Sequence, residues 1–200
     1  MNSSPPDIHI LLVDYPQARQ ATLRLLKQHS DLIVIGQADT YEDVFTQCIN
    51  IMPDIILIEI NIISSILCEF LAHVRVRYPR AQILVLTTCD SVSRVRDSIA
   101  NGVLGYLLKG ETPERIVEAL RAIYIGNACF SRPIARSLAQ GTRTNKDIKV
   151  HLTERERQLL LLIANGCTTS KIADELYLGP QTIRNYLRGR FITLRCALSL

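Results

Sequence analysis

Near its C-terminus the chain carries a run of side chains that could read the edges of nucleic-acid bases. They share long or polar hydrogen-bonding groups, and they are Gln181, Thr182, Arg184, Asn185 and Arg188. Arg184 and Arg188 are one helical turn apart, so both guanidinium groups can reach phosphates or guanine edges from one face. Asn185 and Gln181 offer the paired donor and acceptor that suit adenine. The alternative is a solvated helix face with no ligand.

The distribution of charge favours contact with a polyanion. Residues 1–140 carry 13 lysines and arginines against 14 acidic residues, whereas residues 141–200 carry 10 against 5. The whole excess of positive charge therefore lies C-terminally. Because a small basic domain beside a near-neutral larger one is typical of nucleic-acid binding, we expect double-stranded DNA as the partner.

Three short helices are predicted around these side chains. Thr153–Glu156 forms a capping box, in which each terminal side chain satisfies a free backbone donor at a helix start. Apolar residues then recur to Ile163, a second helix is expected over about Thr168–Leu176, and Gly179 and Pro180 open a third. Three short helices with a tight turn between the last two predict a helix-turn-helix domain.

A family resemblance covers this region. Residues 152–187 resemble the LuxR-type DNA-binding domain of NarL/FixJ-like response regulators, and they read LTERERQLLLLIANGCTTSKIADELYLGPQTIRNYL. The resemblance places Thr182, Arg184, Asn185 and Arg188 on a recognition helix. It also implies that Thr169, Ser170 and Lys171 begin a helix that contacts the phosphate backbone, although the family often has a basic residue where Ser170 stands. The partners it implies are a second copy of the chain and a sensor histidine kinase.

The resemblance ends after Leu187. The family continues with an apolar residue one turn on, a Lys-Leu-Gly and a fourth helix that often mediates dimer contacts, whereas this chain reads RGRFITLRCALSL. Gly189 lies inside the helix at a cost of about 1 kcal/mol, and Arg190 falls where the core needs an apolar residue. Either Arg190 reaches out to solvent or the helix rotates and buries Phe191. We therefore expect this domain to be truncated or altered at its end.

The first 126 residues alternate short apolar runs with helical patterns. Strands are predicted at IHILLV, LIVIG, DIILIE, QILVLT and GYLL, and helices at Pro16–Gln28, Tyr41–Ile51, Ser65–Arg77, Ser91–Ala100 and Pro113–Tyr124. Strands that are apolar on both faces are typical of a parallel sheet covered by helices. The prediction is an α/β, doubly wound, flavodoxin-like domain with a five-stranded parallel sheet.

Domain boundaries follow from these patterns. The doubly wound domain occupies residues 1–126 and the helix-turn-helix domain residues 150–200. Residues 127–149 form a linker, with one short helix at Pro133–Ala139 and the polar stretch GTRTNKD after it.

Four side chains of the first domain are predicted at the carboxyl ends of strands, where open α/β sheets bind ligands. They are Asp14, Glu59, Thr87 and Lys109. The runs LLVD, PDIILIE, VLTT and GYLLK resemble a receiver domain, in which carboxylates hold Mg²⁺, an aspartate accepts a phosphoryl group, a hydroxyl senses it and a lysine pairs with it. The resemblance gives the last two roles to Thr87 and Lys109. Tyr106 matches the switching aromatic, but an aromatic there is equally a packing residue.

The acidic positions depart from the receiver pattern. The acidic pair after the first strand is reduced to Asp14 followed by Tyr15, so Asp14 and Glu59 are the remaining candidates for Mg²⁺ ligands. Glu59 stands at the acceptor position, where its extra methylene moves the carboxylate by about 1.5 Å and misplaces it for in-line attack. We therefore expect no cofactor beyond a weak Mg²⁺ site, and no ordinary aspartate phosphorylation.

Two interpretations of Glu59 stay open. In the first, its carboxylate reaches Thr87 and Lys109 and partly imitates an acylphosphate, which keeps the domain active without a kinase. In the second, Glu59 is only a residue that is tolerated at a site that has lost its function, and Lys109 pairs with whichever carboxylate is nearest.

Other classes of protein are disfavoured. The N-terminus is not signal-like and the most apolar stretch, Ile55–Ile63, is too short to cross a bilayer, so we expect a cytoplasmic protein without membrane contact. The six cysteines are too scattered for a metal site. An enzyme is not expected, because no phosphate-cradling loop follows the first strand. The rival function is a protein-interaction regulator that dimerises through its receiver and binds DNA poorly.

Salt-dependent DNA binding separates the two functions. We expect the full-length protein to bind duplex DNA with an affinity that falls steeply as salt rises, because its basic residues displace counterions from phosphates. Arg184→Ala should weaken binding by about 1–3 kcal/mol and relax the base preference. Fluorescence anisotropy with selected oligonucleotides measures both. Absence of duplex binding at low ionic strength would favour the rival, and unchanged binding by the variant would remove Arg184 from the interface.

Overall fold

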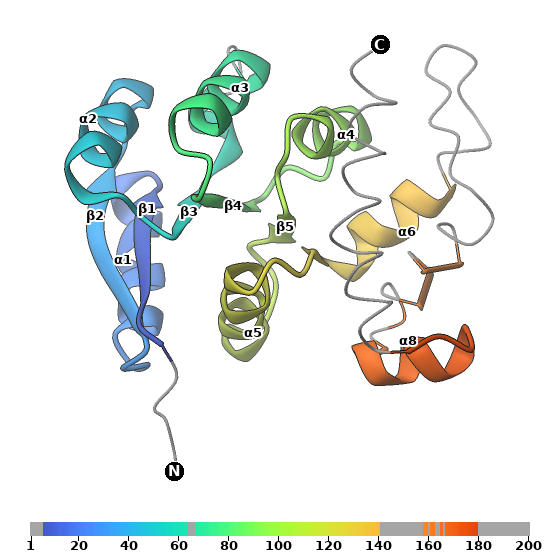
Figure 1. Ribbon diagram of the computed structural model, residues 1–200. Coiled ribbons are helices and arrows are strands. Elements are labelled where there is room, and N and C mark those ends of the chain that lie inside the picture. The colour runs from blue at the N-terminus through green and yellow to red at the C-terminus, as the bar shows by residue number, and fades with distance from the viewer. Residues whose placement is uncertain are drawn as a thin grey trace.

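Six parallel strands form one sheet, in the order β2-β1-β3-β4-β5-β6 (Figure 1). The computed structural model describes residues 6–63, 67–140, 158–159, 161–162, 165 and 167–179. The strands are β1 (Ile8–Val13), β2 (Leu32–Ala38), β3 (Ile55–Ile58), β4 (Gln82–Thr87), β5 (Gly105–Leu108) and β6 (Cys129–Phe130). The helices are α1 (Pro16–Leu26), α2 (Tyr41–Ile51), the 3₁₀ helix η1 (Ile60–Ile63), α3 (Leu67–Arg77), α4 (Val92–Ala100), α5 (Pro113–Tyr124), α6 (Arg132–Gln140) and α8 (Thr169–Glu175). The doubly wound prediction is therefore confirmed.

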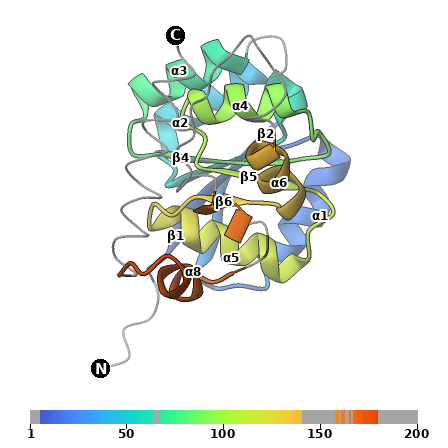
Figure 2. The same cartoon turned by 90° about the vertical axis from the view of Figure 1, so that its right-hand side faces the viewer.

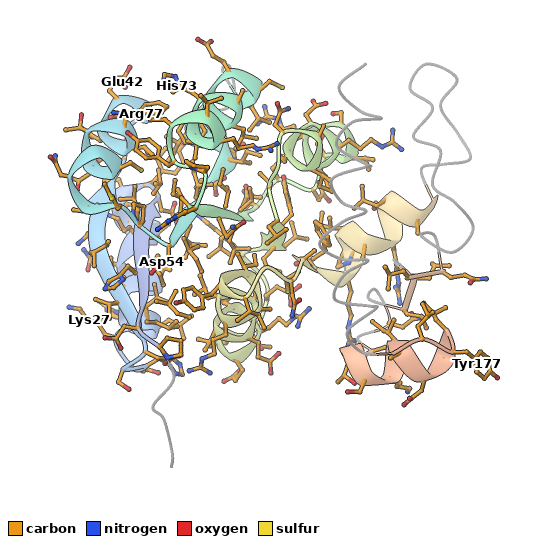
Figure 3. The ribbon with its side chains drawn as sticks, in the orientation of Figure 1. Lys27, Glu42, Asp54, His73, Arg77 and Tyr177 are labelled. Carbon is orange, nitrogen blue, oxygen red and sulfur yellow. The ribbon has the colours of Figure 1, made fainter. Side chains whose placement is uncertain are left out.

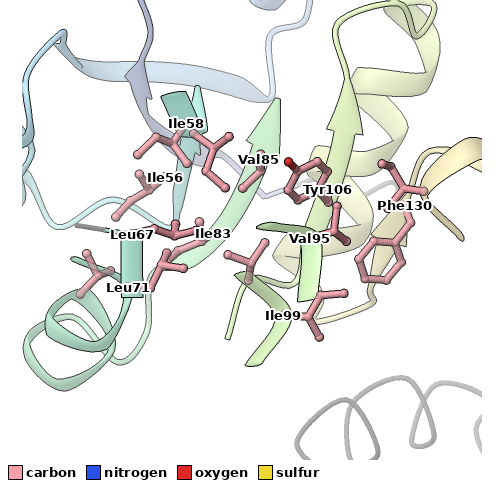
Figure 4. Packing of buried hydrophobic residues seen from close by; sticks show 14 of the residues in the cluster. Ile56, Ile58, Leu67, Leu71, Ile83, Val85, Val95, Ile99, Tyr106 and Phe130 are labelled. Carbon is pink, nitrogen blue, oxygen red and sulfur yellow. The ribbon is translucent and has the colours of Figure 1, made fainter. Parts of the chain in front are cut away.

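The two faces of the sheet have separate cores. Helices α1 and α5 cover one face, and α2, α3 and α4 cover the other (Figures 1 and 2). Side chains alternate between the faces along each strand, so in β1 Leu11 packs under the second group of helices while Ile10 and Leu12 pack against the first. This alternation explains why the central strands are apolar on both sides, since helices cover both faces of the sheet there, whereas the edge strand β2 is partly exposed. Figure 4 shows part of the core on the α3 and α4 side.

Local signals set the starts of several helices. Pro16 and Pro113 stand in the first turns of α1 and α5, where a proline loses no helical hydrogen bond. The side chains of Thr40 and Thr112 accept hydrogen bonds from the first turns of α2 and α5. In the described part of the chain, every helix falls short of the length and apolar character that a membrane span needs.

The sheet has one strand more than the sequence predicts. Cys129 and Phe130 pair with Gly105 and Tyr106 as β6, so the prediction of five strands is wrong. A strand of two residues is too short to show an alternating pattern, which is why the sequence does not reveal it. The Ser131 hydroxyl extends the contact, accepting a hydrogen bond from the Leu108 N–H at 2.9 Å. Residues 129–130 thus belong to the sheet, inside the range predicted as a linker.

Gly105 permits this close approach. A Cβ atom at this position would collide with side chains of Ile123 and Leu84 and lie 3.1 Å from the carbonyl oxygen of Cys129. Only glycine lets α5 and β6 come this near to the start of β5.

The C-terminal segment continues the core on the α4 side. The short helix expected at Pro133–Ala139 is present as α6, which buries Ile134 and Leu138 in the same cluster as Phe130. The second helix of the predicted helix-turn-helix is present as α8, and Ile172 on its buried face belongs to that cluster too. The capping box, the polar part of the predicted linker and the recognition helix with its altered end lie outside the described residues.

Candidate functional site

The structure brings together the four side chains predicted at strand ends. Asp14 follows β1, Glu59 follows β3, Thr87 ends β4 and Lys109 follows β5. Because all these strands are parallel, their carboxyl ends meet at one edge of the sheet. Asp14 is 2% exposed, Glu59 3% and Thr87 0%. The site is therefore a pocket with two buried carboxylates, and each of them needs a partner.

The Lys109 ammonium lies between the two carboxylates. Its Nζ atom is 2.9 Å from Asp14 Oδ1 and 3.0 Å from Glu59 Oε2. Burial by itself lowers the pKa of Lys109, but the hydrogen bonds to both carboxylates outweigh burial and hold that pKa above its ordinary value. Lys109 is therefore a permanent cation at neutral pH, and it joins the ends of three strands.

The other oxygen of Glu59 accepts three hydrogen bonds. Oε1 receives the Thr87 hydroxyl at 2.5 Å, the Asn61 backbone N–H at 3.1 Å and the Asn61 side-chain amide at 3.0 Å. With Lys109 on Oε2, both oxygens of this carboxylate are engaged. A buried carboxylate with this many donors is held in one orientation.

A chain of hydrogen bonds leads from Thr87 to Tyr106. The Thr87 hydroxyl oxygen accepts from the Cys89 N–H at 3.1 Å, and the Tyr106 hydroxyl donates to the Cys89 carbonyl oxygen at 2.8 Å. Tyr106 is fully buried beside Val85 and Val95 (Figure 4). Burial raises the pKa of its phenol, so the phenol stays neutral and remains a donor. Tyr106 is thus both a packing residue and a member of the polar network.

Two residues of this network were missed by reasoning from the sequence. Asn61 clamps the Glu59 carboxylate, and Arg94 in the first turn of α4 donates from Nη1 to the Asn61 side-chain oxygen at 3.3 Å. Asn61 lies only two positions after Glu59, and this short spacing is the feature of the sequence from which the contact could have been predicted. Nothing local marks Arg94, because its contact spans 33 positions of the chain.

The side chains of the pocket do not fit a bound Mg²⁺ ion. Mg²⁺ prefers about six oxygen ligands in octahedral geometry, several of them water. Here Asp14 Oδ1 accepts from the Tyr15 N–H and from Lys109, while both oxygens of Glu59 are engaged. Among the residues that the structure describes, no group of three or more His, Cys, Asp or Glu side chains is placed to hold a metal ion. A lysine cation between the two candidate ligands also opposes a second cation.

Of the predicted DNA-contacting residues, one group lies in the part of the chain that the structure describes and the other lies outside it. Thr169, Ser170 and Lys171 form the first turn of α8, and the Thr168 side chain caps that helix by accepting the Lys171 N–H at 3.3 Å. The side chains of Ser170 and Lys171 are exposed. The base-reading residues, Gln181, Thr182, Arg184, Asn185 and Arg188, lie outside the described residues.

Comparison with known proteins identifies two family segments. Residues 10–121 match the response regulator receiver domain, and residues 150–192 match the bacterial regulatory proteins of the luxR family. Response regulator GacA of Pseudomonas aeruginosa is 30% identical over 183 residues, which cover 90% of this chain and 86% of GacA. The nitrate/nitrite response regulator NarL of Escherichia coli is 28% identical over 193 residues, covering 94% of this chain and 89% of NarL.

A solved structure agrees in fold over most of the chain. The structure of two RcsB dimers bound to two parallel DNAs aligns with a TM-score of 0.61 at 16% identity, covering 96% of this chain and 92% of RcsB. The chain is therefore a response regulator, with a receiver domain followed by a LuxR-type domain. More narrowly, it belongs to the NarL/FixJ family, as the sequence resemblance predicted.

Removing the Lys109 cation should destabilise the protein in a pH-dependent way. Lys109→Met leaves two buried carboxylates without a cation, and the free energy of unfolding at pH 7 should fall by about 3 kcal/mol. The loss should be smaller at pH 5, because a bound proton can replace the missing charge. In the unchanged protein the contribution of Lys109 is fully present below about pH 10 and is lost as the pH rises through its raised pKa.

Urea unfolding at pH 5 and pH 7 measures the effect. Lys27→Met is the matched control, because Lys27 is an exposed lysine at the end of α1 (Figure 3). Equal losses in the two variants, or a loss that does not depend on pH, would contradict the role given to Lys109.

Proposed function

We propose that this chain is a cytoplasmic, DNA-binding regulator of transcription that acts as a homodimer, and that Glu59 holds its receiver active without phosphorylation. The observation that carries the second part is the Glu59 carboxylate, which is bonded to the Thr87 hydroxyl and to the Lys109 ammonium together.

DNA binding is supported by the second segment of the chain. The LuxR-type match covers residues 150–192, and residues 141–200 contain the whole excess of positive charge. The fold resembles that of RcsB, whose dimers are bound to DNA in a solved structure. Lys171 is exposed at the start of α8, where its ammonium group is free to contact a phosphate. These features favour DNA binding over a regulator that acts through protein contacts alone.

The geometry of Glu59 supports the first interpretation of this residue. An acylphosphate in a receiver would engage the sensing hydroxyl and the pairing lysine, and the Glu59 carboxylate engages the corresponding Thr87 and Lys109. Tyr106 is buried, and its hydroxyl is linked through Cys89 to Thr87. One feature agrees with the second interpretation, in which Lys109 pairs with the nearest carboxylate: Lys109 also forms an ion pair with Asp14.

One carboxylate replaces the larger charge of a phosphoryl group only in part. The additional donors compensate for this, because Asn61 fixes the carboxylate and Arg94 fixes Asn61. The Glu59 and Thr87 side chains of this network are buried, where polar contacts are stronger than at the surface. A sensor histidine kinase, the partner that the family implies, would then act on this receiver by binding and not by phosphoryl transfer.

Neutralising Glu59 should weaken DNA binding. Glu59→Gln keeps the shape of the side chain but removes the charge that Lys109 and Thr87 recognise, so the active arrangement loses its support. We expect about a tenfold loss of affinity for duplex DNA, in the middle of the range for coupling between sites. Fluorescence anisotropy with the full-length protein measures this affinity.

The matched control is Glu69→Gln, which removes an exposed glutamate on α3. Its DNA affinity should equal that of the unchanged protein. If Glu59→Gln also binds normally while remaining folded, the second interpretation holds and Glu59 does not imitate a phosphate.

A small phosphodonor should leave the protein unmodified. Incubation with acetyl phosphate and Mg²⁺ should add no acid-labile phosphate, because both Glu59 oxygens are engaged and the ligand set for Mg²⁺ is incomplete. Intact-mass spectrometry before and after acid treatment detects the modification, with a receiver that carries the full acidic set as positive control. Phosphate on Glu59 or Asp14 would refute the proposed independence from phosphorylation.

A further inference from the structure

A cavity of about 440 Å³ lies at the opposite edge of the sheet from the carboxylate pocket. It is bounded by the end of α2, the entry into β3, and the end of α3 with the turn that leads into β4. The lining residues are Cys48, Met52, Pro53, Asp54, Arg77, Tyr78, Pro79, Arg80 and Ala81. Two of them, Asp54 and Arg77, are labelled in Figure 3. The volume falls within the range of about 300–1,000 Å³ that small-molecule sites occupy.

Most of the lining is apolar. Cys48 is fully buried, and burial raises the pKa of its thiol to about 11. Burial likewise raises the pKa of the Tyr78 phenol. Both groups therefore stay neutral at physiological pH and present little charge to the interior. The apolar part of a ligand would therefore be removed from water on entering this cavity, which is favourable.

The charged groups of the cavity differ in how they are partnered. Asp54 is already engaged, because its Oδ2 atom accepts from the His9 N–H at 2.8 Å and lies 3.1 Å from His9 Nδ1. Arg77 and Arg80 are exposed, and within the described part of the chain their guanidinium groups have neither an ion pair nor a hydrogen bond. Among the described residues the rim thus offers two cations without a partner, beside the Asp54 carboxylate, whose Oδ2 atom is bound to His9 and whose charge His9 offsets only when it is protonated.

Main-chain hydrogen bonds hold the cavity walls in place. Asp54 joins its two neighbouring strands, since its N–H donates to the His9 carbonyl at 2.9 Å and its own carbonyl accepts from Gln82 N–H at 2.8 Å. The turn before β4 is closed by a bond from Ala81 N–H to the Tyr78 carbonyl at 3.0 Å. A ligand site built from such fixed elements is preformed and costs little ordering on binding.

Met52 differs from the rest of the wall. Its side chain is 80% exposed, and its backbone has a φ of 43° in the left-handed region, which non-glycine residues seldom occupy. Met52 is the residue that ends α2, where a left-handed backbone is usual, and its flexible thioether can adapt to ligands of varied shape.

We propose that this cavity binds a small amphipathic anion, with the apolar body inside and the acidic group on Arg77 and Arg80. Guanidinium groups recognise planar carboxylates and related oxyanions through paired N–H donors, so an organic acid is the class of ligand that fits. The site goes beyond the proposed function and does not depend on it, since none of its residues belongs to the carboxylate pocket or to α8.

Two fluorescent probes test the proposal on the full-length protein. The first is 8-anilinonaphthalene-1-sulfonate, an apolar aromatic body with one acidic group, and the second is N-phenyl-1-naphthylamine, the same body without the acid. We expect the sulfonate to bind at one site, at least tenfold more tightly than the neutral probe, because only it can engage both arginines. Sodium decanoate, an aliphatic acid, should displace it.

Charge variants locate the site. The double variant Arg77→Gln and Arg80→Gln should weaken sulfonate binding about tenfold and leave the neutral probe unaffected. Both side chains are exposed, so folding should be preserved, and a thermal melt checks this. Arg24→Gln, which removes an exposed arginine on α1, is the control and should bind the sulfonate normally.

Several outcomes would overturn the proposal. These are equal affinity for the two probes, sulfonate binding that the double variant leaves unchanged, absence of saturable sulfonate binding, and equal weakening by the Arg24 control. Because the readout is probe binding, a failure here is distinct from a failure of DNA binding or of the role given to Glu59.

Discussion

Lys109 reaches two carboxylates that the fold has withdrawn from water, and the pocket is arranged around that contact. A carboxylate buried without a cation costs several kcal/mol, and here Asp14 and Glu59 lie on different strands of one sheet. The ammonium therefore stabilises each acid and also ties the ends of β1, β3 and β5 together. The positive charge that stabilises both buried carboxylates is thus provided by a side chain of the protein itself.

The Glu59 carboxylate connects this charge cluster to the rest of the receiver by two routes. One runs through Thr87 and the main chain of Cys89 to Tyr106, and the other runs through Asn61 to Arg94 on α4. Both routes end on the α4 and β5 side of the sheet. The Glu59 carboxylate is thus connected by hydrogen bonds to a residue of α4 and to a residue of β5.

The receiver core extends beyond the segment with regular sequence patterns. Phe130 of β6 and the buried face of α6 fill the same cluster as α4, and the buried side of α8 belongs to it as well. The apolar stripe of α6 requires a cover, and α4 provides it. The chain between the two family segments is thus partly structural.

By itself the sequence determined the doubly wound fold, the type of the C-terminal domain, and the presence of Asp14, Glu59, Thr87 and Lys109 at one edge of the sheet. Those features depend on apolar periodicity and helix caps, which act over a few residues, and on the rule that parallel strands end together. Only the tertiary structure decided which of these groups bond, that β6 joins the sheet and that Arg94 reaches Asn61. Such contacts depend on register and packing between distant segments, as in the 95 positions that separate Lys109 from Asp14, and no local pattern encodes them.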